Sequence, residues 1–415
     1  MCNPKQISKI DFSAAGKNCK VLLGDINNDG RMEMIMVQAD SGIDDRYTPH
    51  QVVCITAFDL EGNMLWQSGK PVLEPGKFGS DFPAQVHDID GDGNLEVLCV
   101  MNKKFRIFDG FSGTIKKEFE LPDEYAHDCI IPANLCGNTG ARDIILKNRY
   151  SDMWALDKDF NLLWKHTGNI GHFPYVYDID GDGMDEVMAG YDMLDQDGSV
   201  LWSCKDLDDH ADCIWVGDVN EDGKVEIAVG GSVTVLYDTK GNEIWRYADS
   251  IESQHIALGK FRDDLRGLQM AGLDRIVRGD GYKGQWDGRD GMFLVDSAGK
   301  GIWKEDRKTK GWLTIVDTYR NWNGEGKDYI LAYRRGGGVN PALYDGFMNP
   351  VVVFPVDGYL VHGDLFGRGI EDAVVYTEDA AYIFSGTPAS MTPCGKKINQ
   401  PKRLSMSTLY PGGEY

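Results

Sequence analysis

Four of the eight histidines in this chain stand immediately before short apolar runs, where they could transfer protons. They are His127 in YAHDCI, His172 in IGHFPYV, His210 in DDHADCIWV and His255 in SQHIALG. A fifth candidate, His87, follows such a run instead of preceding it. Imidazole changes its charge near neutral pH and can act as a general acid or base. A lone histidine beside a strand is more often a polar cap, so these residues suggest a site only if the fold gathers them.

Arginine and tyrosine supply the second group of candidate side chains. They occur in segments that follow the second apolar run of several repeats, together with one more histidine. The segments are DSGIDDRYTPHQ with His50, KNRYSD with Arg149 and Tyr150, LDRIVRGD with Arg275, and YRRGGGVN with Arg334. A guanidinium binds a carboxylate through two parallel hydrogen bonds, which suits an acidic substrate. The alternative interpretation is a set of solvated loop residues.

Four acidic segments share a pattern that is typical of a cation-binding loop. Oxygen-bearing residues occupy the first, third, fifth and ninth positions, and glycine occupies the sixth. The four sets are Asp25, Asn27, Asp29 and Glu33; Asp88, Asp90, Asp92 and Glu96; Asp178, Asp180, Asp182 and Glu186; and Asp218, Asn220, Asp222 and Glu226. The high carboxylate count favours Ca²⁺ over Mg²⁺. The alternative is a set of metal-free turns, because Asp and Asn stabilise such turns unaided.

These residues lie in a repeat that predicts a β-propeller. Apolar runs flank each acidic loop, which indicates a hairpin, and a second hairpin follows in which an Asp precedes a Trp by seven residues. The Asp/Trp pairs are Asp59/Trp66, Asp157/Trp164, Asp195/Trp202, Asp238/Trp245 and Asp296/Trp303. Two hairpins make one four-stranded antiparallel blade, and eight first strands begin near Lys20, Pro83, His127, His172, His210, His255, Trp312 and Tyr359.

We therefore predict an all-β fold with a single β-propeller domain over residues 1–386. Eight blades is the predicted count, and seven is the alternative. The last unit lacks an outer strand, which ISKIDF near the N-terminus could supply. Residues 387–415 are rich in Pro, Ser, Lys and Gly without periodicity, so we expect a tail that wraps the propeller or is loosely ordered.

Propeller geometry assigns the candidate residues to two different rims. The starts of the innermost strands and the loops between second and third strands crowd around one end of the central channel. Most of the histidines, arginines and tyrosines fall there, whereas His87 falls deeper in the channel. The acidic loops join first and second strands on the opposite rim. We therefore expect the acidic loops to be structural and the other rim to carry the chemistry.

Composition narrows the classes of partner. The formal net charge is −22 and no basic stripe is present, which argues against nucleic acid and anionic membranes. No apolar run approaches the roughly 20 residues of a membrane-spanning helix. The nine cysteines lack paired spacing, as is typical of a reducing compartment. We expect a cytoplasmic monomer; the alternative is an exported lipoprotein whose signal is missing from this sequence.

Several segments carry a resemblance to a known group of enzymes. With DDRYTPHQVVCITAFDLEGNMLWQ, GLQMAGLDRI and AYRRGGGVNPALYDG, the chain resembles propeller enzymes that remove terminal L-rhamnose from D-glucuronate. That group contains polysaccharide lyases and α-L-rhamnosidases. The chain is less similar to rhamnogalacturonan and ulvan lyases, and its acidic loops resemble the Ca²⁺ loops of FG-GAP propellers. These resemblances imply structural Ca²⁺ and a site of His, Tyr and Arg near the axis.

The resulting functional hypothesis is a polysaccharide lyase that releases rhamnose from glucuronate of plant-type glycans by β-elimination. This reaction needs a cationic group on the uronate carboxylate, a base for the C5 proton and an acid for the leaving oxygen. We expect Arg149, Arg275 and Arg334 to bind the carboxylate, and His50, His172, His210 and Tyr150 to move protons or contact the sugar, with His87 and His127 as further candidates. The alternatives are an α-L-rhamnosidase and a non-catalytic glycan- or protein-binding module.

Overall fold

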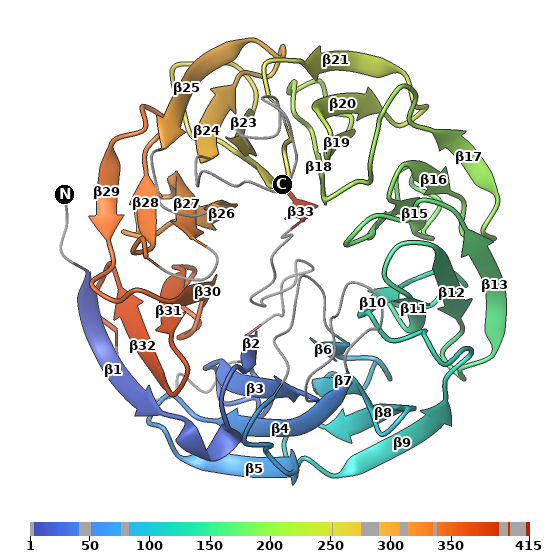
Figure 1. The fold of residues 1–415 in the computed structure, drawn as a ribbon, viewed down its shortest axis with the longest axis vertical. Coiled ribbons are helices and arrows are strands. Elements are labelled where there is room, and N and C mark those ends of the chain that lie inside the picture. The colour runs from blue at the N-terminus through green and yellow to red at the C-terminus, as the bar shows by residue number, and fades with distance from the viewer. Residues whose placement is uncertain are drawn as a thin grey trace.

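The described strands form a closed ring around a central channel (Figure 1). The computed structural model describes residues 4–40, 51–75, 83–250, 252–274, 290–307, 314–334, 338–389, 397–398 and 412–415. The ring has eight four-stranded units. Two of them are merged into one larger sheet by a single parallel pairing of Val52 with Met101. The predicted all-β propeller of eight antiparallel blades is confirmed, and the alternative of seven blades is excluded.

The first four blades follow one another along the chain, each with its innermost strand first. Blade 1 contains β2 (Lys20–Gly24), β3 (Glu33–Ala39), β4 (Val52–Phe58) and β5 (Met64–Gly69). Blade 2 contains β6 (Ala84–His87), β7 (Glu96–Met101), β8 (Lys104–Asp109) and β9 (Ile115–Glu120). Blade 3 contains β10 (Cys129–Ala133), β11 (Asp143–Lys147), β12 (Asp152–Leu156) and β13 (Leu162–Thr167). Blade 4 contains β14 (Tyr175–Tyr177), β15 (Glu186–Ala189), β16 (Asp192–Leu194) and β17 (Val200–Ser203).

The remaining blades complete the ring in the same order. Blade 5 contains β18 (Cys213–Gly217), β19 (Glu226–Gly230), β20 (Thr234–Asp238) and β21 (Glu243–Tyr247). Blade 6 contains β22 (Ile256–Gly259), β23 (Gln269–Asp274), β24 (Asp290–Val295) and β25 (Gly301–Arg307). Blade 7 contains β26 (Thr314–Arg320), β27 (Asp328–Arg334), β28 (Ala342–Tyr344) and β29 (Pro350–Val353). Blade 8 contains β30 (Tyr359–Gly363), β31 (Asp372–Tyr376) and β32 (Ala380–Ser385).

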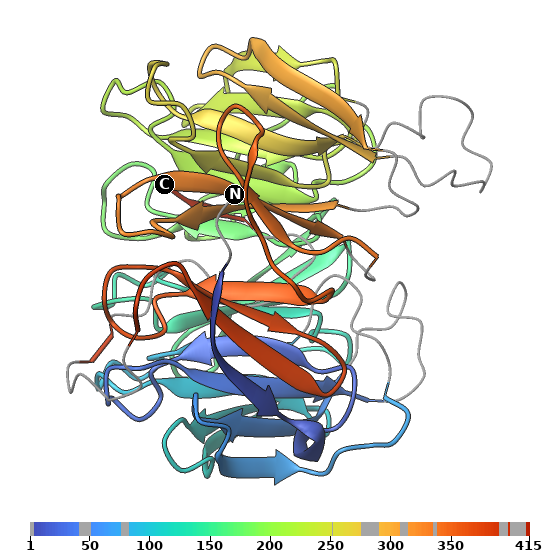
Figure 2. The ribbon, with the colours of Figure 1, turned by 90° about the vertical axis from the view of Figure 1, so that its left-hand side faces the viewer.

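The two ends of the chain are both attached to blades. β1 (Lys5–Asp11), followed by the 3-10 turn η1 (Ser13–Ala15), pairs antiparallel with β32 as the outer strand of blade 8 (Figures 1 and 2). The predicted closure of the ring by the N-terminal segment is therefore confirmed. At the other end, β33 (Gly413–Glu414) pairs parallel with the innermost strand β18 and so lies in the channel. The described part of the tail thus contacts the propeller.

Burial explains why the inner strands are apolar runs and the outer strands alternate. Every residue of β18 and β19 is buried, because both faces of an inner strand pack against neighbouring blades. The outer strand β13 has no buried residue and alternates between exposed and half-buried positions. Removing apolar surface from water contributes about 25 cal/mol per Å². Packing of the inner strands between neighbouring blades therefore stabilises the ring.

Four of the repeated tryptophans join their blade to the next one. The indole N–H of Trp66 donates to the carbonyl of Gly110 at 2.8 Å, and Trp164, Trp202 and Trp245 donate in the same way to carbonyls of the following blade. A side chain has no room at the facing glycine: a Cβ at Gly241 would lie 2.6 Å from Trp202. Gly241 also has a φ of +77°, a conformation that glycine adopts most readily. The predicted packing role of these tryptophans is confirmed.

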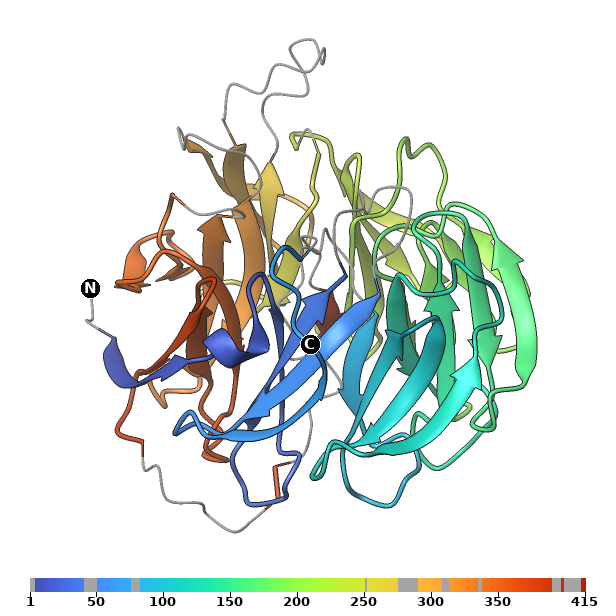
Figure 3. The same cartoon turned by 60° about the horizontal axis from the view of Figure 1, so that its bottom comes forward.

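The strand directions place the two groups of candidate residues on opposite rims. The turn between β2 and β3, in dark blue, lies at the lower rim in Figure 3. The turns between third and fourth strands lie on this same rim, because strand direction reverses at each hairpin. The described loops between second and third strands, and the described links between blades, lie on the upper rim. Among the described residues, no helix has the length and apolar character that a membrane crossing requires.

Candidate active site and acidic loops

The predicted residues Tyr150, His172 and His210 meet at the upper rim, although they come from three separate segments. Tyr150 lies between β11 and β12, His172 precedes β14, and His210 precedes β18. The ring centroids are 4.7 Å apart for His172 and His210, 4.9 Å for Tyr150 and His210, and 5.2 Å for Tyr150 and His172. Blades 3, 4 and 5 each contribute to this group.

Asp212 completes the group, which we call the imidazole cluster: Tyr150, His172, His210 and Asp212. One carboxylate oxygen of Asp212 lies 3.5 Å from Nε2 of both His172 and His210. His210 also contacts Asp209 through Nδ1 at 2.5 Å. Sequence reasoning missed Asp212, although the short spacing in His-Ala-Asp could have signalled it. Tyr150 and His210 are half-buried, whereas His172 and Asp212 are buried, so the first two are the members that a ligand can reach.

The two histidines of the imidazole cluster have opposite protonation preferences. Burial, reinforced by the positive charge of Arg149, lowers the pKa of His172 well below its usual value. Burial also opposes a charge on His210, but the hydrogen bond to Asp209 and the nearby carboxylate of Asp212 outweigh it and raise the pKa of His210 to about 9. At neutral pH the cluster therefore contains one neutral imidazole and one imidazolium. Groups whose environments push their pKa values apart are typical of acid–base sites.

A buried layer of charges supports the cluster from below. The guanidinium of Arg149 lies 5.2 Å from the centre of the Tyr150 ring and 3.8 Å from Asp128. Lys147, which is fully buried, donates to Asp128 at 2.6 Å and to the carbonyl of Arg149 at 3.0 Å. Arg149 is itself only 8% exposed. Its place beneath Tyr150 fits a positioning role better than direct binding of substrate.

The same cluster could hold a metal ion. His172, His210 and Asp212 each offer one ligand atom, and these atoms all lie within 4.8 Å of one another. Two imidazoles and a carboxylate are an ordinary donor set for a divalent transition metal. Burial raises the pKa of Asp212 to about 6, although His210 favours its ionised form. A cation would relieve that cost of burying a carboxylate.

Of the other predicted site residues that the structure describes, His87 and Arg334 lie away from the cluster. Nε2 of His87 lies 2.6 Å from the carbonyl oxygen of Ala141, and His87 lines a cavity of about 580 Å³ with Tyr177 and Asp178, near the acidic rim. His127 is buried next to Asp128. Arg334 ends β27, across the ring from β11, and contacts no cluster member among the described residues (Figure 1). His50 and Arg275 lie outside the described residues.

The four acidic loops share one local geometry at the lower rim. In each loop the last glutamate accepts a hydrogen bond from the backbone N–H of the second loop residue, at 2.8 to 3.1 Å. The first aspartate accepts from the glycine N–H at the sixth position, at 2.9 to 3.2 Å. These bonds turn the carboxylates inward. In blades 2 and 4, three carboxylates approach within 4.8 Å, so these clusters could hold a metal ion.

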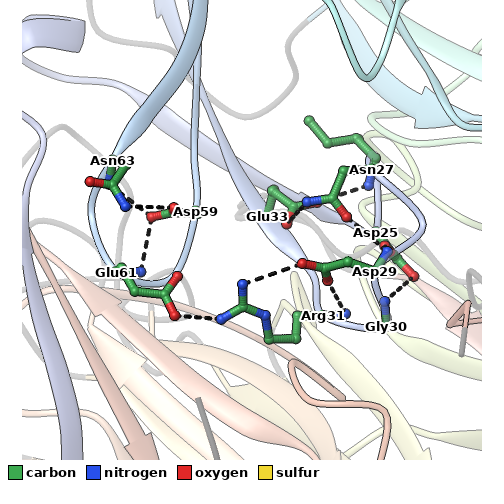
Figure 4. Close-up of polar contacts among 10 residues, drawn as sticks. Asp25, Asn27, Asp29, Gly30, Arg31, Glu33, Asp59, Glu61 and Asn63 are labelled. Carbon is green, nitrogen blue, oxygen red and sulfur yellow. Dashed lines mark hydrogen bonds and ion pairs between the residues drawn. The ribbon is translucent and has the colours of Figure 1, made fainter. Parts of the chain in front are cut away.

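In the loop of blade 1, an arginine connects the acidic loop to a neighbouring turn of the lower rim. Arg31 lies 3.3 Å from Asp29 in its own loop and 2.5 Å from Glu61 in the following turn, as Figure 4 shows. Burial and the neighbouring Asp29 raise the pKa of Glu33 to about 8. Burial likewise raises the pKa of Glu186 in blade 4 to about 7. Burial disfavours the ionised form of these two carboxyl groups, and a bound cation would stabilise that form. This favours the interpretation of the loops as cation sites.

Comparison with known proteins identifies distant relatives. No protein-family model matches the chain. The chain is 25% identical over 262 residues to the rhamnogalacturonan endolyase YesW of Bacillus subtilis (strain 168), covering 48% of this chain and 41% of the relative. It is 26% identical over 265 residues to the rhamnogalacturonan exolyase YesX of the same organism, covering 49% of this chain and 42% of the relative. The alignments thus span less than half of these curated relatives.

Solved structures extend the likeness of fold to nearly the whole chain. The crystal structure of exotype rhamnogalacturonan lyase YesX matches with a TM-score of 0.68 and 19% identity, covering 99% of this chain and 80% of that one. The Vibrio cholerae biofilm matrix protein Bap1 matches with a TM-score of 0.62 and 13% identity, covering 95% and 91%. Fold alone therefore does not select an enzyme. In sequence, the chain is distantly similar to rhamnogalacturonan lyases. In the sequence motifs, this resemblance is weaker than the one to enzymes that remove rhamnose from glucuronate.

Proposed function

We propose that this chain is a polysaccharide lyase that cleaves a uronate-containing glycan by β-elimination. The observation that carries the proposal is the convergence of Tyr150, His172, His210 and Asp212 from three blades on one rim of the channel. The distant similarity to rhamnogalacturonan lyases supports the same class of reaction. A pure binding module would not need a neutral and a charged imidazole in contact.

The half-buried pair Tyr150 and His210 is placed to contact the sugar. The imidazolium of His210 would bind the uronate carboxylate and stabilise the negative charge that develops when C5 loses its proton. The Tyr150 oxygen would take that proton, the C5–H electrons would form the C4–C5 double bond, and the C4–O bond would break with its electrons on the leaving oxygen. Tyr150 would give its own phenolic proton to the leaving oxygen as it takes the proton from C5, so the phenol is regenerated. Neutral His172 beside Tyr150 can accept a hydrogen bond from that phenol and so orient it.

A divalent cation held by His172, His210 and Asp212 would supply the same positive charge to the substrate carboxylate. The role of the protein groups would then be to hold that charge next to Tyr150. Arg149 and Lys147 keep the cluster in place from beneath in either case. Activity that persists in the presence of a chelator would favour the metal-free imidazolium, and activity that is lost would favour the bound cation.

For the substrate, we propose a glycan in which L-rhamnose is linked to a uronate, with rhamnosyl-α-1,4-glucuronate as the specific target. The test is incubation with a rhamnosyl-glucuronate oligosaccharide and, separately, with rhamnogalacturonan oligosaccharides. An unsaturated uronate that absorbs in the ultraviolet supports the lyase, and the active substrate identifies the uronate. Saturated glucuronate with free rhamnose would instead show a hydrolase. Unchanged substrates on both arms would contradict the proposal and leave a binding module.

We also propose that the four acidic loops of the lower rim bind structural Ca²⁺. The support is the inward-turned carboxylates and the raised pKa values of Glu33 and Glu186. Oxygen donors of this number suit Ca²⁺ better than the octahedral, water-rich Mg²⁺.

A further inference from the structure

The four acidic loops differ in what contacts the inner oxygen of their last glutamate. In each loop Oε2 is held by a backbone N–H, so Oε1 is the oxygen that faces the other carboxylates. Oε1 of Glu33 accepts from the Asn27 amide at 2.9 Å, and Oε1 of Glu226 accepts from Asn220 at 2.8 Å. In the other two loops no asparagine contacts Oε1: in blade 4 this oxygen has no hydrogen-bond partner among the described residues, and in blade 2 a lysine contacts it.

In blade 4, Oε1 of Glu186 is buried and has no hydrogen-bond partner among the described residues. Glu186 is 2% exposed, and its carboxylate lies with those of Asp178 and Asp180 within 4.8 Å. Leaving a buried carboxylate oxygen unpartnered costs stability, and a cation at this point would satisfy it. This is an observation about a buried atom, independent of the acidic pattern of the loop.

In blade 2, a lysine from the outer strand occupies the corresponding place. Nζ of Lys116 lies 2.8 Å from Oε1 of Glu96, 2.7 Å from Asp90 and 3.7 Å from Asp92. The ammonium group thus contacts three of the carboxylates that would otherwise bind a metal ion. Lys116 is the second residue of β9, and the equivalent second residue of β17 in blade 4 is Leu201, which is 48% exposed. The register supports this equivalence, because Ile115 and Val200 occupy matching pairs.

In the corresponding loop of blade 8, an arginine within the loop itself contacts the last carboxylate. Asp364 accepts from the N–H groups of Arg368 and Gly369, just as the first aspartate does in the acidic loops. Arg368 stands where an acidic loop has its fifth-position Asp, and its guanidinium donates to buried Asp372 at 2.6 Å. Asp372 pairs with Gly363 as Glu33 pairs with Gly24. A side-chain cation therefore takes the place of the metal ion in this blade.

From these contacts, and resting on the proposed Ca²⁺ loops, we infer that the lower rim contains a graded set of cation sites. The loop of blade 4 is the tightest Ca²⁺ site of the rim, Lys116 competes with Ca²⁺ for the loop of blade 2, and Arg368 replaces the ion in blade 8. The grading follows from Coulomb's law, because a fixed positive charge at 2.7 and 2.8 Å from the ligand oxygens opposes a second cation there.

The test is a reciprocal exchange between blades 2 and 4. Metal-free full-length protein is titrated with CaCl₂ by isothermal titration calorimetry for the wild type, Lys116→Leu, Leu201→Lys and Glu186→Gln. Lys116→Leu should tighten one binding step by at least about tenfold, since it removes the competing charge. Leu201→Lys should weaken the tightest step by a similar factor, and Glu186→Gln should abolish it. Lys117→Met, one residue further along the same exposed strand, is the matched control and should titrate as the wild type does.

Two results would overturn the inference, and they differ from failure of the Ca²⁺ sites themselves. If the wild type binds Ca²⁺ but Lys116→Leu and Leu201→Lys leave every step unchanged, the grading is wrong while the sites stand. If Glu186→Gln retains the tightest step, that step belongs elsewhere. If the wild type binds no Ca²⁺ at millimolar concentration, both the grading and the proposed sites fail. Melting curves of each variant in chelator establish that the differences arise in folded protein.

Discussion

The two rims of this propeller use polar residues in opposite ways. On the lower rim the four oxygen-bearing residues of each acidic loop come from one hairpin, and the backbone hydrogen bonds that turn their carboxylates inward join residues at most seven positions apart. On the upper rim no single segment contains the imidazole cluster, because Tyr150, His172 and His210 come from different blades. The acidic loop of the lower rim therefore recurs from blade to blade, whereas the imidazole cluster of the upper rim is formed by blades 3, 4 and 5 together.

This contrast shows how a repeat protein can separate folding from chemistry. A repeated local loop stabilises each blade whether or not its neighbours carry the same loop, so individual copies can be lost, as in blade 8. A cluster built from several blades exists only when the ring has closed. Changes on the upper rim should therefore alter activity with little effect on stability, and changes on the lower rim should do the reverse.

The largest expected effect is on the upper rim. Tyr150→Phe removes only the hydroxyl group, and we expect kcat/KM to fall by roughly 10² to 10⁴-fold because proton transfer to and from the sugar is lost. The melting temperature should stay within about 2 °C of the wild type, since one half-buried hydroxyl contributes little to stability. Tyr125→Phe, at an exposed position before β10, is the control and should keep full activity. A Tyr150→Phe enzyme with wild-type kcat/KM would remove Tyr150 from the reaction.

The second effect is on the lower rim. Removal of divalent cations should lower the melting temperature by several degrees or more, because an ion that binds only the folded state stabilises it by about 2.7 kcal/mol at a concentration 100 times its Kd. Differential scanning calorimetry in chelator and in excess Ca²⁺ measures the shift. An identical transition in both conditions would mean that the acidic loops are metal-free turns.

The sequence predicted the propeller well because the relevant signals are local. Hairpin turns, apolar runs and the Asp-to-Trp spacing each depend on a few neighbouring residues, so the starts of β2, β22 and β30 fall within one residue of their predicted places. Even the closure by β1 followed from counting strands. These features repeat, and each copy reinforces the interpretation of the others.

The candidate site was predicted only in part, because side-chain direction is not local. Arg149, Tyr150, His172 and His210 meet as the topology implied, but Asp212 was missed since its two histidine contacts appear only when two blades pack together. His87 lies away from the cluster, deeper in the channel as expected, and Arg334 belongs to blade 7, on the other side of the ring from blade 3. Lys116 escaped notice for the same reason, because it reaches the acidic loop from an outer strand.

A smaller effect tests the electrostatics of the upper rim. Asp212→Asn removes one of the carboxylates that raise the pKa of His210 to about 9, so the pKa of His210 should fall. If activity requires imidazolium, the alkaline limb of the kcat/KM profile should move to lower pH, with a loss of about 10 to 100-fold near pH 8 and partial recovery near pH 6. An alkaline limb that stays in place would show that His210 does not act as a cation.

The smallest expected effect lies next to the lower rim, where His362 joins blades 7 and 8. Its Nδ1 lies 2.8 Å from Glu371 and its Nε2 lies 3.2 Å from Asp317. Burial opposes the charge, but the two carboxylates outweigh it and raise the pKa of His362 to about 9. Because the folded pKa exceeds the unfolded value of 6.5, this stabilisation is complete below about pH 6.5 and is lost as the pH rises through 9.

His362→Gln should therefore lower the free energy of unfolding by about 2 kcal/mol near pH 6 and by much less near pH 9.5. Urea unfolding of both proteins at several pH values gives the difference directly. A glutamine at this position retains hydrogen-bonding capacity without the charge, so the pH dependence isolates the electrostatic contribution. A difference that stays constant across this pH range would assign the role of His362 to packing against Tyr319, whose ring lies 4.6 Å away.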